Sequence, residues 1–250
     1  MMPTKQIDLN ADLGEHPGVN LDKQIMPYLS SCNVACGGHV GDEHSIRSTL
    51  MLAKEYGVSI GAHPSFPDKE NFGRVVMEIS SASLRESLFQ QIQLVRSVSE
   101  ELGTTLNHVK PHGALYNLAA RDKATSILIG KVIKSIDPGL KWMGLAGSIS
   151  QKVSEDLKVP FIAEAFADRR YEPNGALMSR QKEGAVITEE AELIQQVEEI
   201  ALRRRVFSEK WITLQPDSIC LHGDTEGAVN LARKIHDHLV SKGVSIHSIQ

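Results

Sequence analysis

The chain has 250 residues, of which 41% are hydrophobic and 23% are charged, a composition typical of a globular protein with one large core. Its formal net charge is −4, and neither sign forms a long block. The charge pattern therefore argues against a nucleic-acid partner and against a polybasic membrane patch. No apolar run approaches the roughly 20 residues of a membrane-spanning helix, so we expect no membrane insertion.

The three cysteines are too few, and odd in number, for a disulfide framework. Cys32 and Cys36, with His39 and His44 nearby, could in principle bind zinc, but the second cysteine pair of a typical structural zinc site is missing. We therefore interpret the cysteines as small buried thiols. The N-terminal residues lead directly into a strand pattern and do not resemble a signal peptide, so we expect a cytoplasmic protein.

Short apolar runs alternate with longer amphipathic segments along the chain, which indicates a parallel α/β fold. The predicted strands are residues 7–10, 29–36, 58–64, 106–109, 142–145, 161–165 and 218–221, with a last short strand or tail at 244–249. Helices are predicted to begin near Glu43, at a capping box of Ser83 and Glu86, after Asp122, before Val153, at Thr188 and, capped by Asp224, before Ala228. Residues 172–187 show little regular pattern and are interpreted as a long functional loop.

Ionisable side chains directly follow six of the seven predicted strands. They are Asp12 with Glu15, His39 with Asp42, His63, Lys110 with His112, Asp168 with Arg170, and His222 with Asp224. An open sheet concentrates such groups at one switch point, whereas a closed barrel directs every strand end to one mouth. The distribution favours a single domain, residues 1–250, that forms an irregular seven-stranded β/α barrel. The alternative is an open parallel sheet, although the Gly-x-Gly-x-x-Gly fingerprint is absent after the first strand.

The stretch 107–117 contains both a lysine and a histidine at a strand end. Lys110 and His112 are two residues apart, so strand geometry would direct both side chains to the same side. Pro111 between them fixes the local backbone angle φ. A cation beside an adjustable proton carrier suits an anionic intermediate and its proton transfers. The alternative is a polar strand end that serves only as scaffold.

Histidines and carboxylates at several strand ends suit polar, anionic or metal-assisted chemistry. Asp12, His39 and His63 form a candidate set of ligands for a divalent metal. Each histidine could also be a structural residue, and Asp12 and Glu15 could simply cap a turn.

The acidic and basic groups near the last strands have two interpretations. Asp168, Arg169 and Arg170 could form a solvated charge cluster, or they could recognise a carboxylate through a fork of donors. Asp224 could be purely a helix cap. The sequence contains no phosphate-binding loop and no His-Glu-x-x-His motif. It also contains no Gly-x-Ser-x-Gly motif, which argues against serine acyl transfer.

Six ordered blocks of the sequence resemble the LamB/YcsF family, to which the A subunits of 5-oxoprolinase belong. The blocks are Asp8-Leu-Asn-Ala-Asp-Leu-Gly-Glu15, Asn33-Val-Ala-Cys-Gly-Gly-His-Val-Gly-Asp42, Gly61-Ala-His-Pro-Ser-Phe-Pro-Asp68, Val109-Lys-Pro-His-Gly-Ala-Leu-Tyr-Asn117, Glu164-Ala-Phe-Ala-Asp-Arg169 and Cys220-Leu-His-Gly-Asp224. Two loops depart from the usual family pattern, His16-Pro17-Gly18 and Asn71-Phe72-Gly73-Arg74-Val75. Both departures bear on loop geometry rather than on the fold.

The resemblance implies a seven-stranded barrel related to glycoside hydrolase and deacetylase barrels. It also implies one component of an ATP-dependent 5-oxoprolinase, which opens the lactam of 5-oxo-L-proline to L-glutamate together with subunits B and C. ATP would then be a co-substrate. The catalytic candidates are Asp12, His63, Lys110 and His112, and the substrate-binding candidates are Glu15, His39, Asp168, Arg170, His222 and Asp224.

Two other classes of function remain open. One is a metal-dependent amidohydrolase or deacetylase, and the other is a non-catalytic subunit that holds the lactam or scaffolds its partners. For the enzyme, we expect Lys110→Met and His112→Ala each to abolish most lactam opening with a nearly unchanged thermal midpoint. A scaffold role predicts a loss of stability instead.

Overall fold

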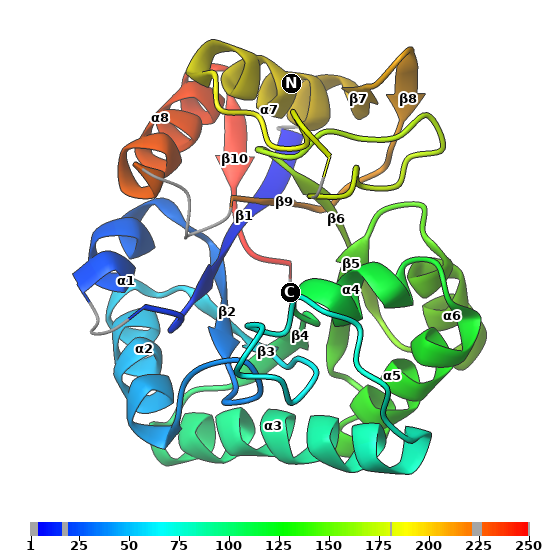
Figure 1. The fold of residues 1–250 in the computed structure, drawn as a ribbon. Coiled ribbons are helices and arrows are strands. Elements are labelled where there is room, and N and C mark those ends of the chain that lie inside the picture. The colour runs from blue at the N-terminus through cyan, green and yellow to red at the C-terminus, as the bar shows by residue number, and fades with distance from the viewer. Residues whose placement is uncertain (1–4, 17–19, 181, 222–226, 250) are drawn as a thin grey trace.

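Seven parallel strands close into a barrel, and helices surround it (Figure 1). The computed structural model of the protein describes residues 5–16, 20–180, 182–221 and 227–249. The barrel strands are β1 (Lys5–Leu13), β2 (Ser31–Ala35), β3 (Ser59–His63), β4 (Leu106–Val109), β5 (Lys141–Leu145), β6 (Phe161–Phe166) and β9 (Ser218–Cys220). Strand β9 pairs in parallel with both β6 and β1, and this closes the barrel. The predicted irregular seven-stranded barrel is confirmed, and the alternative of an open sheet is wrong.

The helices follow the strands in chain order and lie around the barrel in Figure 1. They are α1 (Asn20–Ile25), the 3₁₀ helix η1 (Met26–Tyr28), α2 (Glu43–Tyr56), α3 (Ser81–Glu101), α4 (Gly113–Ala119), α5 (Lys123–Ile136), α6 (Ile149–Leu157), α7 (Glu190–Arg203) and α8 (Ala228–Ser241).

Two helix caps lie close to the positions that the sequence predicts. Asp122 accepts a hydrogen bond from the Thr125 backbone N–H and caps α5, as predicted. Helix α3 begins earlier than predicted, because the Ser80 hydroxyl accepts from the backbone N–H of Ser83. Ser83 is therefore inside the first turn of α3 and is not its cap.

Polar side chains line the interior of the barrel. Successive strand residues point to opposite faces, so a polar residue between two core residues points into the barrel. Leu9 and Ala11 of β1 belong to the hydrophobic core. Between them, Asn10 donates from Nδ2 to Ser218 Oγ on β9 at 2.8 Å and to Glu164 Oε1 on β6 at 2.9 Å. Strand β6 is separated from β1 by β9, so the bond between Asn10 and Glu164 crosses the interior. This polar interior leads up to the strand ends where the ionisable groups lie.

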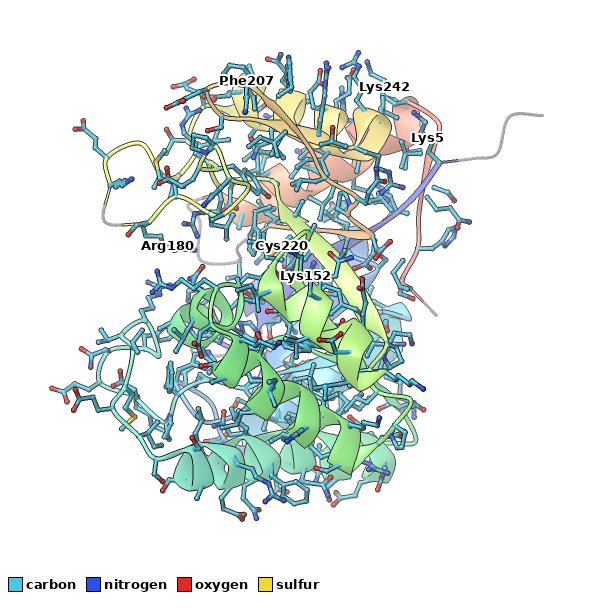
Figure 2. The ribbon with its side chains drawn as sticks, turned by 90° about the vertical axis from the view of Figure 1, so that its right-hand side faces the viewer. Lys5, Lys152, Arg180, Phe207, Cys220 and Lys242 are labelled. Atoms are coloured by element: carbon cyan, nitrogen blue, oxygen red, sulfur yellow. The ribbon has the colours of Figure 1, made fainter. Side chains whose placement is uncertain are left out.

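The C-terminal part of the chain adds structure that the sequence pattern did not reveal. Strands β7 (Arg205–Phe207) and β8 (Trp211–Thr213) form an antiparallel hairpin, and β10 (Val244–Ile246) pairs in parallel with β1. The predicted choice at 244–249 between a strand and a tail is thus resolved as a strand. Side chains of the hairpin lie at the periphery, as Phe207 shows in Figure 2, whereas Cys220 of β9 lies within the molecule. Among the described residues, no helix is long and apolar enough to cross a membrane.

Candidate active site

A buried lysine joins two carboxylates where the strands of the barrel end. Lys110 directly follows β4, and its Nζ lies 2.9 Å from Asp12 Oδ1 on β1 and 2.8 Å from Glu164 Oε1 on β6. It also lies 3.3 Å from Asn10 Oδ1 and 3.1 Å from Cys220 Sγ. Burial alone would lower the pKa of the Lys110 ammonium, but Asp12 and Glu164 hold that pKa well above its ordinary value. Lys110 is therefore a fixed positive charge at the base of the site.

Three imidazoles and a carboxylate lie together beside this ion pair. Glu15 Oε1 is 2.9 Å from His39 Nε2, 3.3 Å from His112 Nδ1 and 3.9 Å from His63 Nε2. The rings of His39 and His112 are stacked, with centroids 3.8 Å apart, and the His63 ring is nearly perpendicular to both. His63 Nε2 is also 3.3 Å from Asp12 Oδ2, so the histidine cluster is continuous with the ion pair of Lys110.

Backbone carbonyls bind the outer nitrogens of two of these rings. His63 Nδ1 is 2.7 Å from the carbonyl oxygen of Lys110, and His112 Nε2 is 2.9 Å from that of Phe72. A carbonyl oxygen only accepts, so each of these ring nitrogens carries a hydrogen and donates it. The remaining nitrogens, His63 Nε2 and His112 Nδ1, face each other at 3.0 Å.

Burial keeps several of the histidines uncharged near neutral pH. Desolvation, with a smaller contribution from His63, lowers the pKa of both His39 and His112 to about 3, while Asp12 opposes the shift. The fully buried His108, which bonds from Nε2 to Asn33 Oδ1, also has a pKa lowered to about 3 by burial. His39 and His112 are therefore neutral imidazoles near neutral pH.

The loop between β3 and α3 forms one wall of the site. It is cyan in Figure 1, where it passes across β3 and β4. Phe72 has a φ of 53°, in the left-handed region, and its ring packs against the His39 ring. Gly73 follows with a φ of 64°, and a Cβ atom there would lie 3.0 Å from His112 Cδ2 and 3.1 Å from His39 Cβ. Glycine at this position therefore allows the loop to approach the imidazoles closely.

Several buried polar atoms near β6 have no hydrogen-bond partner among the described residues. They include Glu164 Oε2, Tyr116 Oη and Arg169 Nε. Burial and the nearby Glu164 carboxylate hold the pKa of the Tyr116 hydroxyl well above its ordinary value, and burial lowers the pKa of Arg169. Unpartnered groups of this kind are costly in a folded protein unless a ligand or water satisfies them.

The structure brings together six of the residues that the sequence singled out: Asp12, Glu15, His39, His63, Lys110 and His112. The other predicted groups lie elsewhere or are not described. Asp168 is buried at the end of β6, whereas Arg170 forms a bidentate ion pair with Glu192 of α7 and is about 41% exposed. Asp42 is exposed and caps α2. His222 and Asp224 lie outside the described residues.

Sequence reasoning missed several residues that contact the cluster. Glu164, Asn10 and Asn33 were not selected, because each lies within a strand rather than after one, and Tyr116 lies inside helix α4. A charged residue in the middle of the predicted strand 161–165 was the available signal for Glu164.

The ring nitrogens and carboxylate oxygens form two overlapping groups that could hold a metal ion. Asp12, His63 and His112 make one group, and Glu15, His39 and His112 make the other. Within each group the candidate ligand atoms lie within 4.8 Å of one another. His112, rather than His39, thus joins Asp12 and His63, in contrast to the set proposed from the sequence.

The closed parallel β/α barrel is a fold that this chain shares with solved structures of low sequence identity. The peptidoglycan deacetylase PdaC from Bacillus subtilis superimposes with a TM-score of 0.52 over 99% of this chain and 89% of that chain, at 12% sequence identity. A family 4 carbohydrate esterase from Streptomyces lividans superimposes with a TM-score of 0.50 over 98% of this chain and 93% of that chain, at 11% identity. These similarities concern the fold alone.

The sequence comparisons define the family. The LamB/YcsF family profile matches residues 7–250, and the chain belongs to this family. It is 45% identical to the A subunit of 5-oxoprolinase from Histophilus somni over 246 residues, which cover 98% of this chain and 99% of the relative. The corresponding protein of Haemophilus influenzae strain PittEE is 41% identical over 97% of this chain and 99% of its own length. The crystal structure of a lactam utilization protein from Thermus thermophilus superimposes with a TM-score of 0.91, at 34% identity, over 98% of this chain and all of that one.

Proposed function

We propose that this protein is the A subunit of a 5-oxoprolinase and opens the lactam of 5-oxo-L-proline to L-glutamate, coupled to ATP hydrolysis, with subunits B and C. The observation that carries the proposal is the 45% identity, over nearly the full length of both chains, to a protein named as the A subunit of 5-oxoprolinase. The clustering of carboxylates, imidazoles and a lysine at the barrel mouth supports it, because amide hydrolysis requires proton transfer and stabilisation of charge.

The chemical difficulty of the reaction explains a requirement for ATP. The lactam is an unstrained, resonance-stabilised amide, so water attacks its carbonyl carbon slowly. Transfer of the γ-phosphoryl group from ATP to the amide oxygen activates that carbon. Water then adds, the carbon–nitrogen bond breaks and the nitrogen takes up a proton, which leaves an acyl phosphate. A second water hydrolyses the acyl phosphate to glutamate and phosphate.

The site contains groups suited to the proton transfers. His63 Nε2 and Asp12 Oδ2 are 3.3 Å apart, and in our proposal this pair accepts the proton of the attacking water. The carbonyl of Lys110 holds the ring of His63 in position through Nδ1. His112 lies 3.0 Å from His63 and passes the proton onward toward the lactam nitrogen.

The unpartnered polar atoms next to the cluster suit the polar atoms of a small lactam acid. In our proposal, Arg169 Nε donates to the substrate carboxylate, and Glu164 Oε2 accepts from the lactam N–H. Lys110 lies between this region and Asp12, where its ammonium offsets negative charge that develops on the lactam oxygen. Glu15 and His39, which bond to each other, lie beside His112 in the same cluster.

The need for ATP, without a recognisable ATP-binding motif in this chain, is the reason to expect partner subunits. The chain contains no phosphate-binding loop of the Gly-x-x-x-x-Gly-Lys-Ser/Thr type, so in our proposal the ATP-dependent step requires subunits B and C. The test measures glutamate formed from 5-oxo-L-proline by this chain alone, by B with C, and by the three together, each with and without ATP. We expect efficient glutamate formation only from the three together with ATP. Full ATP-coupled turnover by this chain alone would refute the requirement for partners.

A metal-dependent amidohydrolase is the second candidate, and the convergence of Asp12, His63 and His112 favours it. The same assay separates the two, because a metal-dependent amidohydrolase opens the ring without ATP. If the subunit is non-catalytic and only holds the lactam, a variant of the site should retain turnover in the mixture of the three subunits.

We also propose a cytoplasmic location, which the three free, buried thiols support.

A further inference from the structure

The two imidazoles at the centre of the site face each other through nitrogens that carry no hydrogen when the rings are neutral. The backbone carbonyls of Lys110 and Phe72 fix the hydrogens of His63 and His112 on the opposite sides of the rings. His63 Nε2 and His112 Nδ1 therefore present two lone pairs to each other at 3.0 Å. Two acceptors at hydrogen-bond distance repel each other unless a proton or a cation lies between them.

Carboxylate oxygens add to this concentration of acceptors. Asp12 Oδ2 lies 3.3 Å from His63 Nε2, and Glu15 Oε1 lies 3.3 Å from His112 Nδ1. The side chains of Asp12 and Glu15 are only 10% and 6% exposed, so water does little to screen them. Four acceptors from four different segments of the chain thus meet in one small, buried space.

A single shared proton would satisfy the pair of imidazoles and would place one positive charge beside the Asp12 and Glu15 carboxylates. Lys110 compensates Asp12 through Oδ1, yet the same ammonium also compensates Glu164. That one ammonium is shared between two carboxylates. A divalent cation adds positive charge beside Asp12 and Glu15 and uses both imidazole lone pairs at once.

Backbone and side-chain contacts fix the orientation of these acceptor groups in the way that is usual for metal ligands. In metal sites a ligating histidine commonly donates its other ring N–H to a backbone carbonyl, as His63 and His112 do. Stacking against His39 fixes the ring of His112, and the bond from His39 Nε2 fixes Glu15.

We propose that His63 Nε2, His112 Nδ1 and the Asp12 carboxylate bind one divalent transition-metal ion, with Glu15 as the fourth ligand and His39 as a positioning residue for Glu15. Two imidazoles with carboxylates suit zinc and similar ions better than magnesium, which prefers oxygen ligands. Such an ion, when bound, polarises a carbonyl and lowers the pKa of a bound water. The inference deepens the proposed active site: a bound ion would occupy the two lone pairs of the proposed proton relay, so that relay belongs to the ion-free site. The test contains neither lactam nor ATP, so its failure is distinguishable from failure of the proposed function.

The test uses the full chain without a histidine tag, stripped with a chelator and then titrated with Zn²⁺, Co²⁺ or Mg²⁺. Calorimetry and elemental analysis after dialysis measure affinity and stoichiometry. We expect about one Zn²⁺ or Co²⁺ per chain and weaker binding of Mg²⁺. His63→Gln and His112→Gln should each weaken Zn²⁺ binding about tenfold or more, whereas His44→Gln, an exposed histidine on α2, should not.

A measurement on the unaltered chain keeps the inference testable if a variant fails to fold. Nitrogen-15 spectra of the imidazoles should show hydrogens on His63 Nδ1 and His112 Nε2, and Zn²⁺ should shift the opposite nitrogens. The inference is overturned if the unaltered chain retains no zinc after dialysis, if folded His112→Gln binds zinc as tightly as the unaltered chain, or if zinc leaves both imidazole signals unchanged.

Discussion

At the scale of single residues, Lys110 contributes both to stability and to the chemistry of the site. Its side chain is 2% exposed and contacts Asp12, Glu164 and Asn10. The sequence-based expectation was that Lys110→Met would leave the thermal midpoint nearly unchanged. A lysine buried between two carboxylates makes that expectation untenable, because its removal leaves buried negative charges without a partner.

We therefore predict that Lys110→Met lowers the free energy of unfolding by about 3–5 kcal/mol and also removes most lactam opening. Denaturant unfolding measures the first effect, and the reconstituted assay measures the second. Lys152→Met, at an exposed lysine labelled in Figure 2, is the matched control and should change neither. Unaltered unfolding of Lys110→Met would show that Asp12 and Glu164 are compensated in another way.

The buried His108 predicts a dependence of stability on pH. Burial lowers its pKa from 6.5 to about 3, so the unfolded chain binds a proton below about pH 6.5 that the folded chain does not bind. Stability contributed by the neutral ring is complete above pH 6.5 and is lost as pH falls from 6.5 toward 3. The slope is about 1.4 kcal/mol per pH unit for each such proton.

Comparison of His108→Gln with the unaltered chain isolates this effect. Glutamine can donate to Asn33 as His108 does, but it does not titrate. Denaturant unfolding between pH 7.5 and 5 should show a shallower loss of stability for the variant, by about one proton. Equal slopes for the two proteins would contradict the assignment of a neutral His108 in the folded state.

The position of a site residue relative to its strand determines whether the sequence alone reveals it. Lys110 and His112 could be recognised because they come directly after an apolar run. Glu164 and Asn10 lie within strands, where a charged or polar residue is a weaker signal until the barrel interior is known. Arg170 and its neighbour Arg169 look alike in sequence, yet Arg170 pairs with Glu192 and Arg169 is buried.

At the scale of elements, a close contact between β3 and β4 positions the interior of the barrel. A Cβ atom on Gly61 of β3 would lie 2.1 Å from His108 Nε2 on β4, closer than atoms can approach. The ring of His108 cannot move away easily, because it is fully buried and bonded to Asn33. Glycine at position 61 is therefore required by packing rather than by backbone conformation.

We predict that Gly61→Ala destabilises the protein by about 1–3 kcal/mol, as overpacking of a core usually does. Thermal and denaturant unfolding measure the change. Gly139→Ala is the control, because Gly139 lies in a loop where the nearest atom to an added Cβ is Asp137 Oδ1 at 3.3 Å. A Gly61→Ala variant as stable as the control would mean that the contact between β3 and His108 relaxes freely.

The long elements could be predicted from sequence because their hydrophobic periodicity is strong, and the short ones could not. Helix α2 begins at Glu43, as predicted, and α5 begins after its predicted cap Asp122. Strands β7 and β8 have three residues each, too few to show a period of two. The described residues of 172–187 form no helix or strand and contribute one end to each of two isolated bridges, which agrees with the predicted irregular loop.

At the scale of the whole molecule, closure of the barrel is what unites residues distant in the sequence. Asp12, His63 and His112 come from the ends of β1, β3 and β4, and the barrel directs all three to one mouth. The number of strand ends that carry ionisable groups allowed this convergence to be predicted. The distances within the cluster, and the place of His112 rather than His39 beside Asp12, depend on strand register and loop geometry, which the sequence pattern does not specify.

We also propose that residues 1–250 act as a single domain. The pairing of β10 with β1 supports this, because it joins a strand near residue 245 to the first strand of the barrel. Unfolding followed by circular dichroism and by tryptophan fluorescence should then give coincident transitions. Two separate transitions would contradict a single cooperative unit.

The most direct test of the central claim is the rate of glutamate formation by the three mixed subunits with ATP when His112 is replaced. His112→Ala should lower this rate by about 10²–10⁴-fold at a temperature where circular dichroism shows the variant to be folded, because a proton-transfer group and its contact with His63 are lost. His44→Ala, at an exposed histidine of α2, should retain the full rate. A folded His112→Ala variant that supports undiminished, ATP-dependent lactam opening would contradict the assignment of the chemistry to the barrel mouth.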